Sequence, residues 1–316
     1  MENIKWKRLV KYLGRFIGLV SIVFVVKRII YFDIDYAVIL EPRSIIILIL
    51  TIIVQAIIIF FTAYPWTIYV EIITGKTFLL RETMIVIAKA NIMKYIPGNV
   101  FQYVGRNELA LRKGLKHADV AIATILDVTI GLIIGVVFSF LLITNYVFSF
   151  FAKYFSSFSP LYIIGIVLFF IVGFGVLILL RKKNHLFVSI TRNITKKRNI
   201  PKMLKCIGYY LFINTISSIL LLVILIFVMN QTISITLAIN LSGAYVFSVI
   251  VGLITPGVSG GIGIREGMML AMASGMLDGA TITFAMVIMR FICILADLLS
   301  YILVLIFAKN QTISKQ

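Results

Sequence analysis

The sequence has few charged residues for its length. Only 13% of its 316 residues are Asp, Glu, Lys or Arg, whereas 61% are hydrophobic. Soluble globular domains contain about 25% charged and about 45–50% apolar residues. The mean hydropathy is +1.09. This composition excludes a cytosolic fold and predicts an all-α integral membrane protein, with one polytopic domain over residues 1–316.

Residues that bind metals or perform catalysis are also scarce. The two cysteines, Cys206 and Cys293, lie in apolar stretches far apart, and the two histidines, His117 and His185, lie in basic loops. The sequence contains no HExxH motif and no paired Cys or His ligands. We therefore predict no disulfide framework, no metal, no cofactor and no catalytic residue. A membrane-embedded enzyme that modifies lipids or glycans, or its membrane subunit, stays an alternative.

Long apolar runs are abundant. A helix needs about 20 apolar residues to cross a bilayer, and six runs approach this length, approximately residues 9–26, 44–66, 120–144, 161–180, 204–229 and 281–308. They predict about six full transmembrane helices. Lys27 and Arg28 follow the first run where a signal peptide would have a small-residue cleavage site, so this run is predicted to be a retained helix.

Positive charge lies mainly between the apolar runs. The net charge is +18, and residues 181–205 include nine Lys or Arg and no acid, whereas residues 230–236 are uncharged. Basic loops stay on the cytoplasmic side, so both termini are predicted to be cytoplasmic and the protein to lie in the cell (cytoplasmic) membrane. The charge indicates contact with an anionic membrane surface rather than nucleic-acid binding.

Two further segments are interrupted by proline and glycine. Residues 83–105 are broken at Pro97 and Gly98, and residues 237–267 at Pro256 and Gly257. Backbone groups freed by such breaks at membrane depth must face protein or a water-filled cavity. We therefore predict two broken or re-entrant helices that border a cavity.

The two breaks resemble each other. Arg106 follows Pro97 by nine positions, and Arg265 follows Pro256 by nine. Each break is followed by a short polar link and then by an apolar helix that contains charged residues. Residues of about 83–144 and 237–308 are therefore predicted to form a repeat. The predicted topology inverts the second half relative to the first, as in many transporters with midplane sites.

Three charged residues interrupt the apolar runs themselves: Asp127, Arg290 and Asp297. A charge at the membrane centre costs about 2.5–3.5 kcal/mol on insertion scales, so such residues face the protein interior, a partner or a pathway. We predict a buried charge pair or a switch, with Arg106, Arg265 or Arg290 as the partner of Asp127. A purely structural ion pair is the alternative.

Arg106 and Arg265 are the predicted substrate contacts. Each follows a break near the start of a helix, where a guanidinium, free backbone N–H groups and the positive helix end suit phosphate. Glu108 and Glu266 are expected in the first turns of these helices, where they cap the helix or bind an amine. Lys94 adds a third cation or extends toward the headgroups.

These segments resemble a known family. Lys94-Tyr95-Ile96-Pro97-Gly98 with Gln102, Gly105 and Arg106, and Pro256-Gly257 followed by Gly260-Gly261-Ile262-Gly263-Ile264-Arg265-Glu266-Gly267, are similar to the hallmarks of the lysylphosphatidylglycerol synthase transmembrane region. This flippase-like family forms the membrane half of the multiple-peptide-resistance factor. The resemblance implies a stand-alone member without the synthase domain. Val128 follows Asp127 where similar proteins often have arginine, which leaves the partner of Asp127 open.

The predicted function combines the breaks with the resemblance. It is a flippase-like transporter, not an enzyme, that moves a phospholipid or a polyprenyl-phosphate-type lipid across the membrane. An ion-coupled transporter of a soluble anion is an alternative. Association with an envelope-biosynthesis enzyme and homo-oligomer formation stay open. The predicted substrate-binding residues are Lys94, Pro97, Gly98, Gln102, Gly105, Arg106, Glu108, Pro256, Gly257, Gly260, Gly261, Gly263, Arg265 and Glu266.

Overall fold

The computed structural model describes residues 37–95, 101–143, 196–255 and 259–313. This part of the chain is all-α. Five of its helical segments are long and apolar enough to cross a membrane, namely Pro42–Thr74, His117–Leu142, Lys197–Val228, Ile235–Ile254 and Gly279–Ile306. The prediction of an all-α fold is thereby confirmed for the described residues, and the five segments indicate a multi-pass membrane protein.

Four of the six predicted spans coincide with these segments. The run 44–66 covers α3 (Pro42–Phe61) and part of α4 (Ala63–Thr74), and the run 120–144 falls on α7 (His117–Leu142). The other two fall on α11 (Ile200–Val223) with its π-helical end η3 (Ile224–Val228), and on α14 (Gly279–Ile313). The predicted spans 9–26 and 161–180 lie outside the described residues.

The fifth long segment, α12 (Ile235–Ile254), differs from its prediction. It was included in the second broken segment, but its 20 residues form one uninterrupted helix. The reason is the position of the break. Pro256 follows the end of α12, and the two glycines within the helix, Gly243 and Gly252, keep their backbone N–H groups, so no hydrogen bond is lost within the apolar run.

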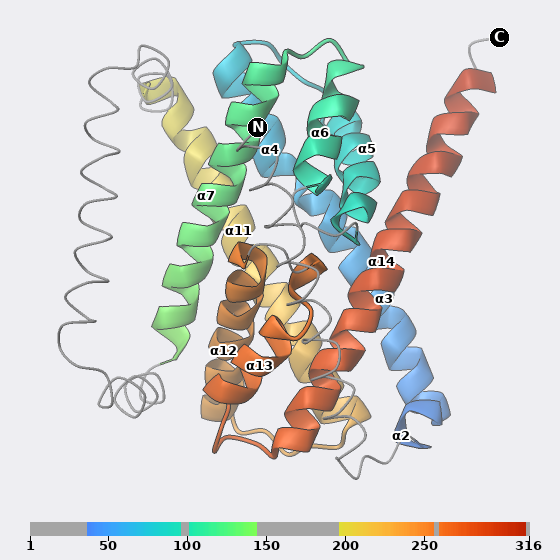
Figure 1. Cartoon of the computed structure of the whole chain (residues 1–316), viewed down its shortest axis with the longest axis vertical. Helices are drawn as coiled ribbons and strands as arrows, with labels where there is room; N and C mark the ends of the chain where they lie inside the picture. Colours follow the sequence, from blue (N-terminus) through green and yellow to red (C-terminus); the bar gives the residue numbers. More distant parts are fainter. Residues whose placement is uncertain (1–36, 96–100, 144–195, 256–258, 314–316) are drawn as a thin grey trace, which may run out of the picture.

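Both segments predicted to be broken form helical hairpins. In the first, α5 (Leu80–Asn91) ends in the 3-10 turn η1 (Ile92–Tyr95), and the chain returns in α6 (Phe101–Leu111). In the second, α12 leads through η4 (Ser259–Gly261) into α13 (Ile264–Met272). The hairpins occupy opposite halves of the molecule (Figure 1), and their tips, η1 and η4, contact each other.

The second tip depends on glycine. Gly260, Gly261 and Gly263 all have positive φ angles, of 56°, 73° and 79°, which other L-residues rarely adopt. A Cβ atom on Gly261 would also lie 2.8 Å from the Cα atom of Gly252 in α12. Both effects require glycine where the tip folds back onto α12.

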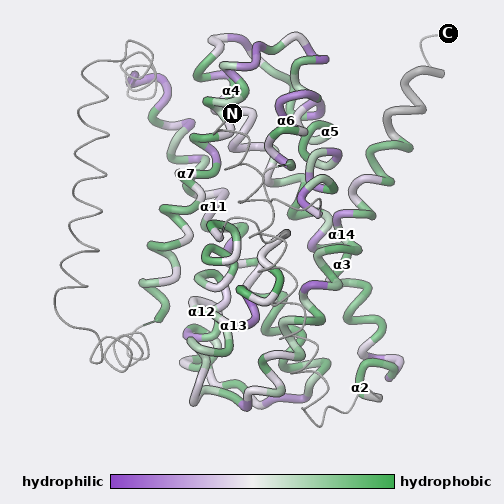
Figure 2. The backbone as a smooth tube through the Cα atoms, in the orientation of Figure 1, coloured by the Kyte–Doolittle hydropathy of each residue, from purple (hydrophilic) through white to green (hydrophobic). Residues whose placement is uncertain are grey.

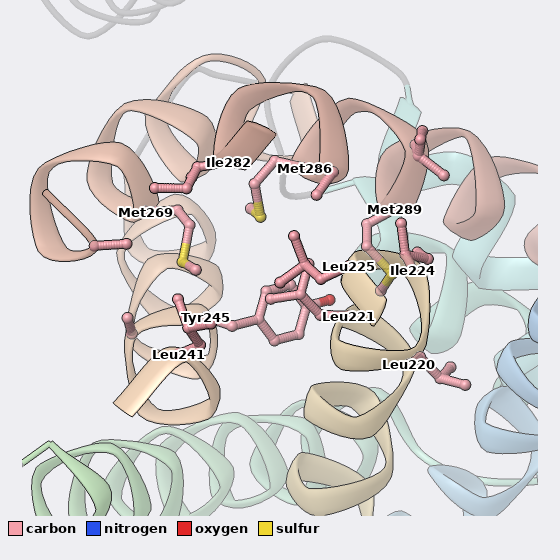
Figure 3. Packing of buried hydrophobic residues seen from close by; sticks show 14 of the residues in the cluster. Leu220, Leu221, Ile224, Leu225, Leu241, Tyr245, Met269, Ile282, Met286 and Met289 are labelled. Atoms are coloured by element: carbon pink, nitrogen blue, oxygen red, sulfur yellow. The ribbon is translucent and has the colours of Figure 1, made fainter. Parts of the chain in front are cut away.

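Two apolar clusters hold the hairpins in place. One joins α11, α12, α13 and α14, and Figure 3 shows Leu221, Tyr245, Met269 and Met286 converging from these four helices. The other surrounds the fully buried Trp66 and includes residues of α4, α5 and α7. Burying one large apolar side chain of this kind stabilises the fold by about 1.5–3 kcal/mol relative to leaving the side chain exposed to water.

The outer surface is apolar and the ends differ in charge. Figure 2 shows hydrophobic residues along α3, α7 and α14, and hydrophilic residues at the end where α4 joins α5 and α6 joins α7. That end carries Lys76, Arg112, Lys113 and Lys116, whereas the link from η3 to α12, at the other end, is uncharged. This asymmetry is typical of membrane proteins oriented by their basic loops.

Candidate functional site

A cavity of about 380 Å³ lies between the tips of the two hairpins. Residues of both hairpins and of α3, α7, α11 and α14 line it. Cations outnumber acids in its lining, which includes the charged residues Lys94, Arg106, Asp127, Arg265, Glu266 and Arg290. The structure thus brings together charged residues that are up to about 200 positions apart in the sequence.

Arg106 is the partner of Asp127. Its Nη1 atom lies 2.9 Å from Asp127 Oδ2, and the hydroxyl of Tyr210 donates a hydrogen bond of 2.6 Å to Asp127 Oδ1. Arg106 is 8% exposed, and its Nε atom has no hydrogen-bond partner among the described residues. Of the three candidate partners of Asp127, neither Arg265 nor Arg290 forms this pair.

Lys94 and Tyr95 connect the first hairpin to α14. The Lys94 ammonium forms a salt bridge with Asp297 Oδ2, and the Tyr95 hydroxyl donates a hydrogen bond to the same oxygen. Asp297 is only 1% exposed. Lys94 is therefore directed into the protein rather than toward the headgroups, and Asp297 anchors the tip.

Glu266 caps its own helix. Its Oε2 atom accepts a hydrogen bond of 2.6 Å from the backbone N–H of Gly263, and its Oε1 atom lies 3.7 Å from Nη1 of Arg290. An acid in the first turn of a helix is stabilised by the helix dipole. The capping role predicted for Glu266 is the one found, and Arg290 accompanies it.

Arg265 differs from the other cavity cations. Within the described residues its side chain has neither an ion pair nor a hydrogen bond, and its Nε atom is buried without a partner. Its aliphatic part packs on Gly252 of α12, where an added Cβ would lie 2.3 Å from Arg265 Cγ. The close packing directs the second residue of α13 into the cavity.

The remaining predicted site residues divide into three groups. Gln102 and Gly260 line the cavity, whereas Gly105, Gly261 and Gly263 do not. Gly105 instead allows α6 to approach Met93, whose Sδ atom would be 2.2 Å from an added Cβ. The four residues at the breaks, Pro97, Gly98, Pro256 and Gly257, lie outside the described residues.

Glu108 was predicted incorrectly to lie in the first turn of its helix. It is the eighth residue of α6 as described, which begins at Phe101, and its side chain is exposed outside the cavity. The sequence pattern placed the start of the helix too close to Arg106. Glu108 therefore does not share the environment of Glu266.

Sequence reasoning missed the contribution of α11. Tyr210, Asn214 and Ser217 line the cavity from this helix, for which the sequence predicts only an apolar span. Their spacing places them on one face of a helix. A polar stripe within an otherwise apolar run was the signal that could have identified them.

No cluster of His, Cys, Asp and Glu suited to a metal ion occurs within the described ranges. Comparisons of the chain with family models, curated proteins and solved structures found no match. The resemblance to the lysylphosphatidylglycerol synthase transmembrane region therefore stays a prediction.

Proposed function

We propose that this protein is a flippase-like transporter that moves a phosphate-bearing lipid across the cytoplasmic membrane. The observation that carries this proposal is Arg265, a cation in a central cavity that lacks a protein partner among the described residues. A charge inside a membrane protein is costly unless it is paired or hydrated. An anionic group of the substrate supplies that partner.

Phosphate fits this cavity better than an amine. Beside Lys94, Arg265 and Arg290, the described residues supply two acids, Asp297 paired with Lys94 and Glu266 paired with Arg290. One positive charge is therefore in excess, and a guanidinium binds phosphate through two parallel hydrogen bonds. Both oxygens of Asp127 and both of Glu266 already face protein groups. Arg265 makes the first contact with phosphate, and Arg106 contributes only when it separates from Asp127.

The arrangement of helices supports an alternating-access transporter. We interpret α5–α6–α7 and α12–α13–α14 as an inverted repeat, each consisting of a re-entrant hairpin and a full span. In Figure 1, α7 and α14 run in opposite directions along the molecule, and the hairpins approach from opposite ends. Inverted repeats of this kind create a site at mid-membrane that opens to either side.

The basic end is interpreted as cytoplasmic. The turns after α4 and α6 contain Lys and Arg, as does the start of α11. In the proposed orientation the first hairpin enters from the cytoplasm and the second from outside.

Reconstituted vesicles provide the test. Protein in phosphatidylglycerol vesicles with a trace of fluorescent phospholipid is exposed to a membrane-impermeant quencher, which reports movement of the probe between leaflets. We expect wild-type protein to move the probe and Arg265→Ala to slow it about 10- to 100-fold, because a hydrogen bond to a charged group contributes about 1.5–3 kcal/mol.

Arg112→Ala is the matched control. Arg112 is an exposed arginine after α6 and does not line the cavity, so its removal should leave the rate unchanged. Equal rates for wild type and Arg265→Ala would contradict the role of Arg265. Wild-type vesicles that move no lipid with any phosphate head group would contradict the function itself.

A further inference from the structure

A second hollow, of about 390 Å³, lies between α6 and α7. Its walls include Tyr103 and Val104 of α6 and Ala121, Ile125 and Val128 of α7. Val104 is 50% exposed and Ile125 is 64% exposed, and α7 is one of the candidate membrane spans. We call this hollow the α6/α7 groove. Apolar side chains make up most of its lining, which also includes Asn107, Thr124 and Thr129.

The α6/α7 groove adjoins the charged cavity. Tyr103 and Val128 line both hollows, so these two side chains form the wall between them. The charged pair of the cavity borders the same wall. The guanidinium carbon of Arg106 lies 5.7 Å from the centre of the Tyr103 ring, and Asp127 precedes Val128 in α7.

From this juxtaposition we propose that the α6/α7 groove holds a hydrocarbon chain of the transported lipid while its phosphate occupies the charged cavity. Apolar chains are stabilised by apolar walls, whereas a phosphate requires charged or polar partners. Only a molecule with both parts uses both hollows. A soluble anion would use the cavity alone, so the substrate class becomes a tailed phosphate that enters sideways between α6 and α7.

Tyr103 and Val128 are then positioning residues at the junction of head and tail. The Tyr103 ring offers an apolar face to the hydrocarbon chain and makes a cation–π contact with Arg106. One side chain thus contacts both the apolar groove and the charged cavity. This inference rests on the proposed function. It adds the side of access and the requirement for a tail.

Filling the groove tests the inference. Ala121 lines the groove but not the charged cavity, so Ala121→Trp occupies the space for the chain without touching the phosphate site. Val128→Trp fills the shared wall. Ile133→Trp is the control, because Ile133 is a 58% exposed residue of α7 that lines neither hollow.

Two measurements separate the outcomes. Vesicles report movement of the long-chain fluorescent phospholipid, and titration calorimetry of the purified protein reports binding of glycerol 3-phosphate, a head group without a tail. We expect Ala121→Trp and Val128→Trp to slow lipid movement at least tenfold. Ala121→Trp should bind glycerol 3-phosphate within twofold of wild type, and Ile133→Trp should change neither quantity.

Lipid movement at the wild-type rate in both groove variants would overturn the inference and leave the proposed function intact. Loss of head-group binding in Ala121→Trp would also overturn it, since the groove would then not be separate from the phosphate site. If wild-type protein binds glycerol 3-phosphate but moves no lipid, the proposed function itself fails. Each failure is therefore recognised by a different result.

Discussion

Arg106 and Asp127 form an ion pair of 2.9 Å that joins the first hairpin to the long helix following it. The two residues are 21 positions apart, and both are largely enclosed by protein. Tyr210 of α11 completes the arrangement by donating to the second carboxylate oxygen. Three helices thus meet at one carboxylate beside the cavity.

Replacing Asp127 by asparagine should destabilise the protein. Arg106, which is 8% exposed, would keep its charge but lose its counter-charge. Removal of one partner of a buried ion pair costs about 3–5 kcal/mol. We expect a lower unfolding temperature of Asp127→Asn in detergent, followed by intrinsic fluorescence. The double variant Arg106→Gln/Asp127→Asn should recover part of the loss. An unchanged unfolding temperature in the single variant would show that the pair contributes no stability.

The contact of Lys94 and Tyr95 with Asp297 should keep the first tip closed. Asp297→Asn weakens both interactions at once, because they share Oδ2. We expect faster amide hydrogen exchange in η1 (Ile92–Tyr95), measured by mass spectrometry on peptides, while exchange in α11 stays as in wild type. Glu71→Gln is the control. Glu71 pairs with the half-exposed Lys202, an interaction worth at most about 1 kcal/mol. Unaltered exchange in η1 would argue against a closing contact.

Gly252 should be required for the position of Arg265. A Cβ at this position would lie 2.3 Å from Arg265 Cγ, so Gly252→Ala must displace the arginine or the helix. Such overpacking costs about 1–3 kcal/mol, and we expect lower stability together with slower lipid movement.

Gly208→Ala provides the comparison for Gly252→Ala. Gly208 lies within α11 and no atom is within 4 Å of its added Cβ. Alanine is favoured over glycine in a helix by about 0.8–1.0 kcal/mol, so this variant should be as stable as wild type or more so. Equal behaviour of the two alanine variants would remove the argument that Gly252 makes room for Arg265.

The two cysteines should react differently with water-soluble thiol reagents. Cys293 lines the cavity, whereas Cys206 is buried with no exposed surface. We expect one modified cysteine per chain, at Cys293, by mass spectrometry of the protein in vesicles. The excess of cations should make an anionic methanethiosulfonate react faster than a cationic one. Added glycerol 3-phosphate should slow the reaction. Modification of Cys206 first would contradict a hydrated central cavity.

The sequence predicted the all-α class and the positions of four of the five long helical segments, because these depend on local properties. Apolar runs such as 120–144 and 281–308 identify α7 and α14 without any knowledge of their neighbours. Proline and glycine likewise mark the two breaks, since their backbone effects act within a few residues. The boundaries were less accurate, as the position of Glu108 within α6 demonstrates.

The pairing of the charges was decided only by the tertiary structure. Sequence alone left three arginines as candidate partners of Asp127, and it did not connect Lys94 with Asp297 or identify Tyr210. Which charges meet depends on how the hairpins pack between the long helices, because electrostatic contacts act over a few ångströms in space and not along the chain. The same packing leaves Arg265 without a partner in the described part of the cavity. Composition thus predicted a membrane protein, and packing decided which of the cavity cations lacks a partner among the described residues.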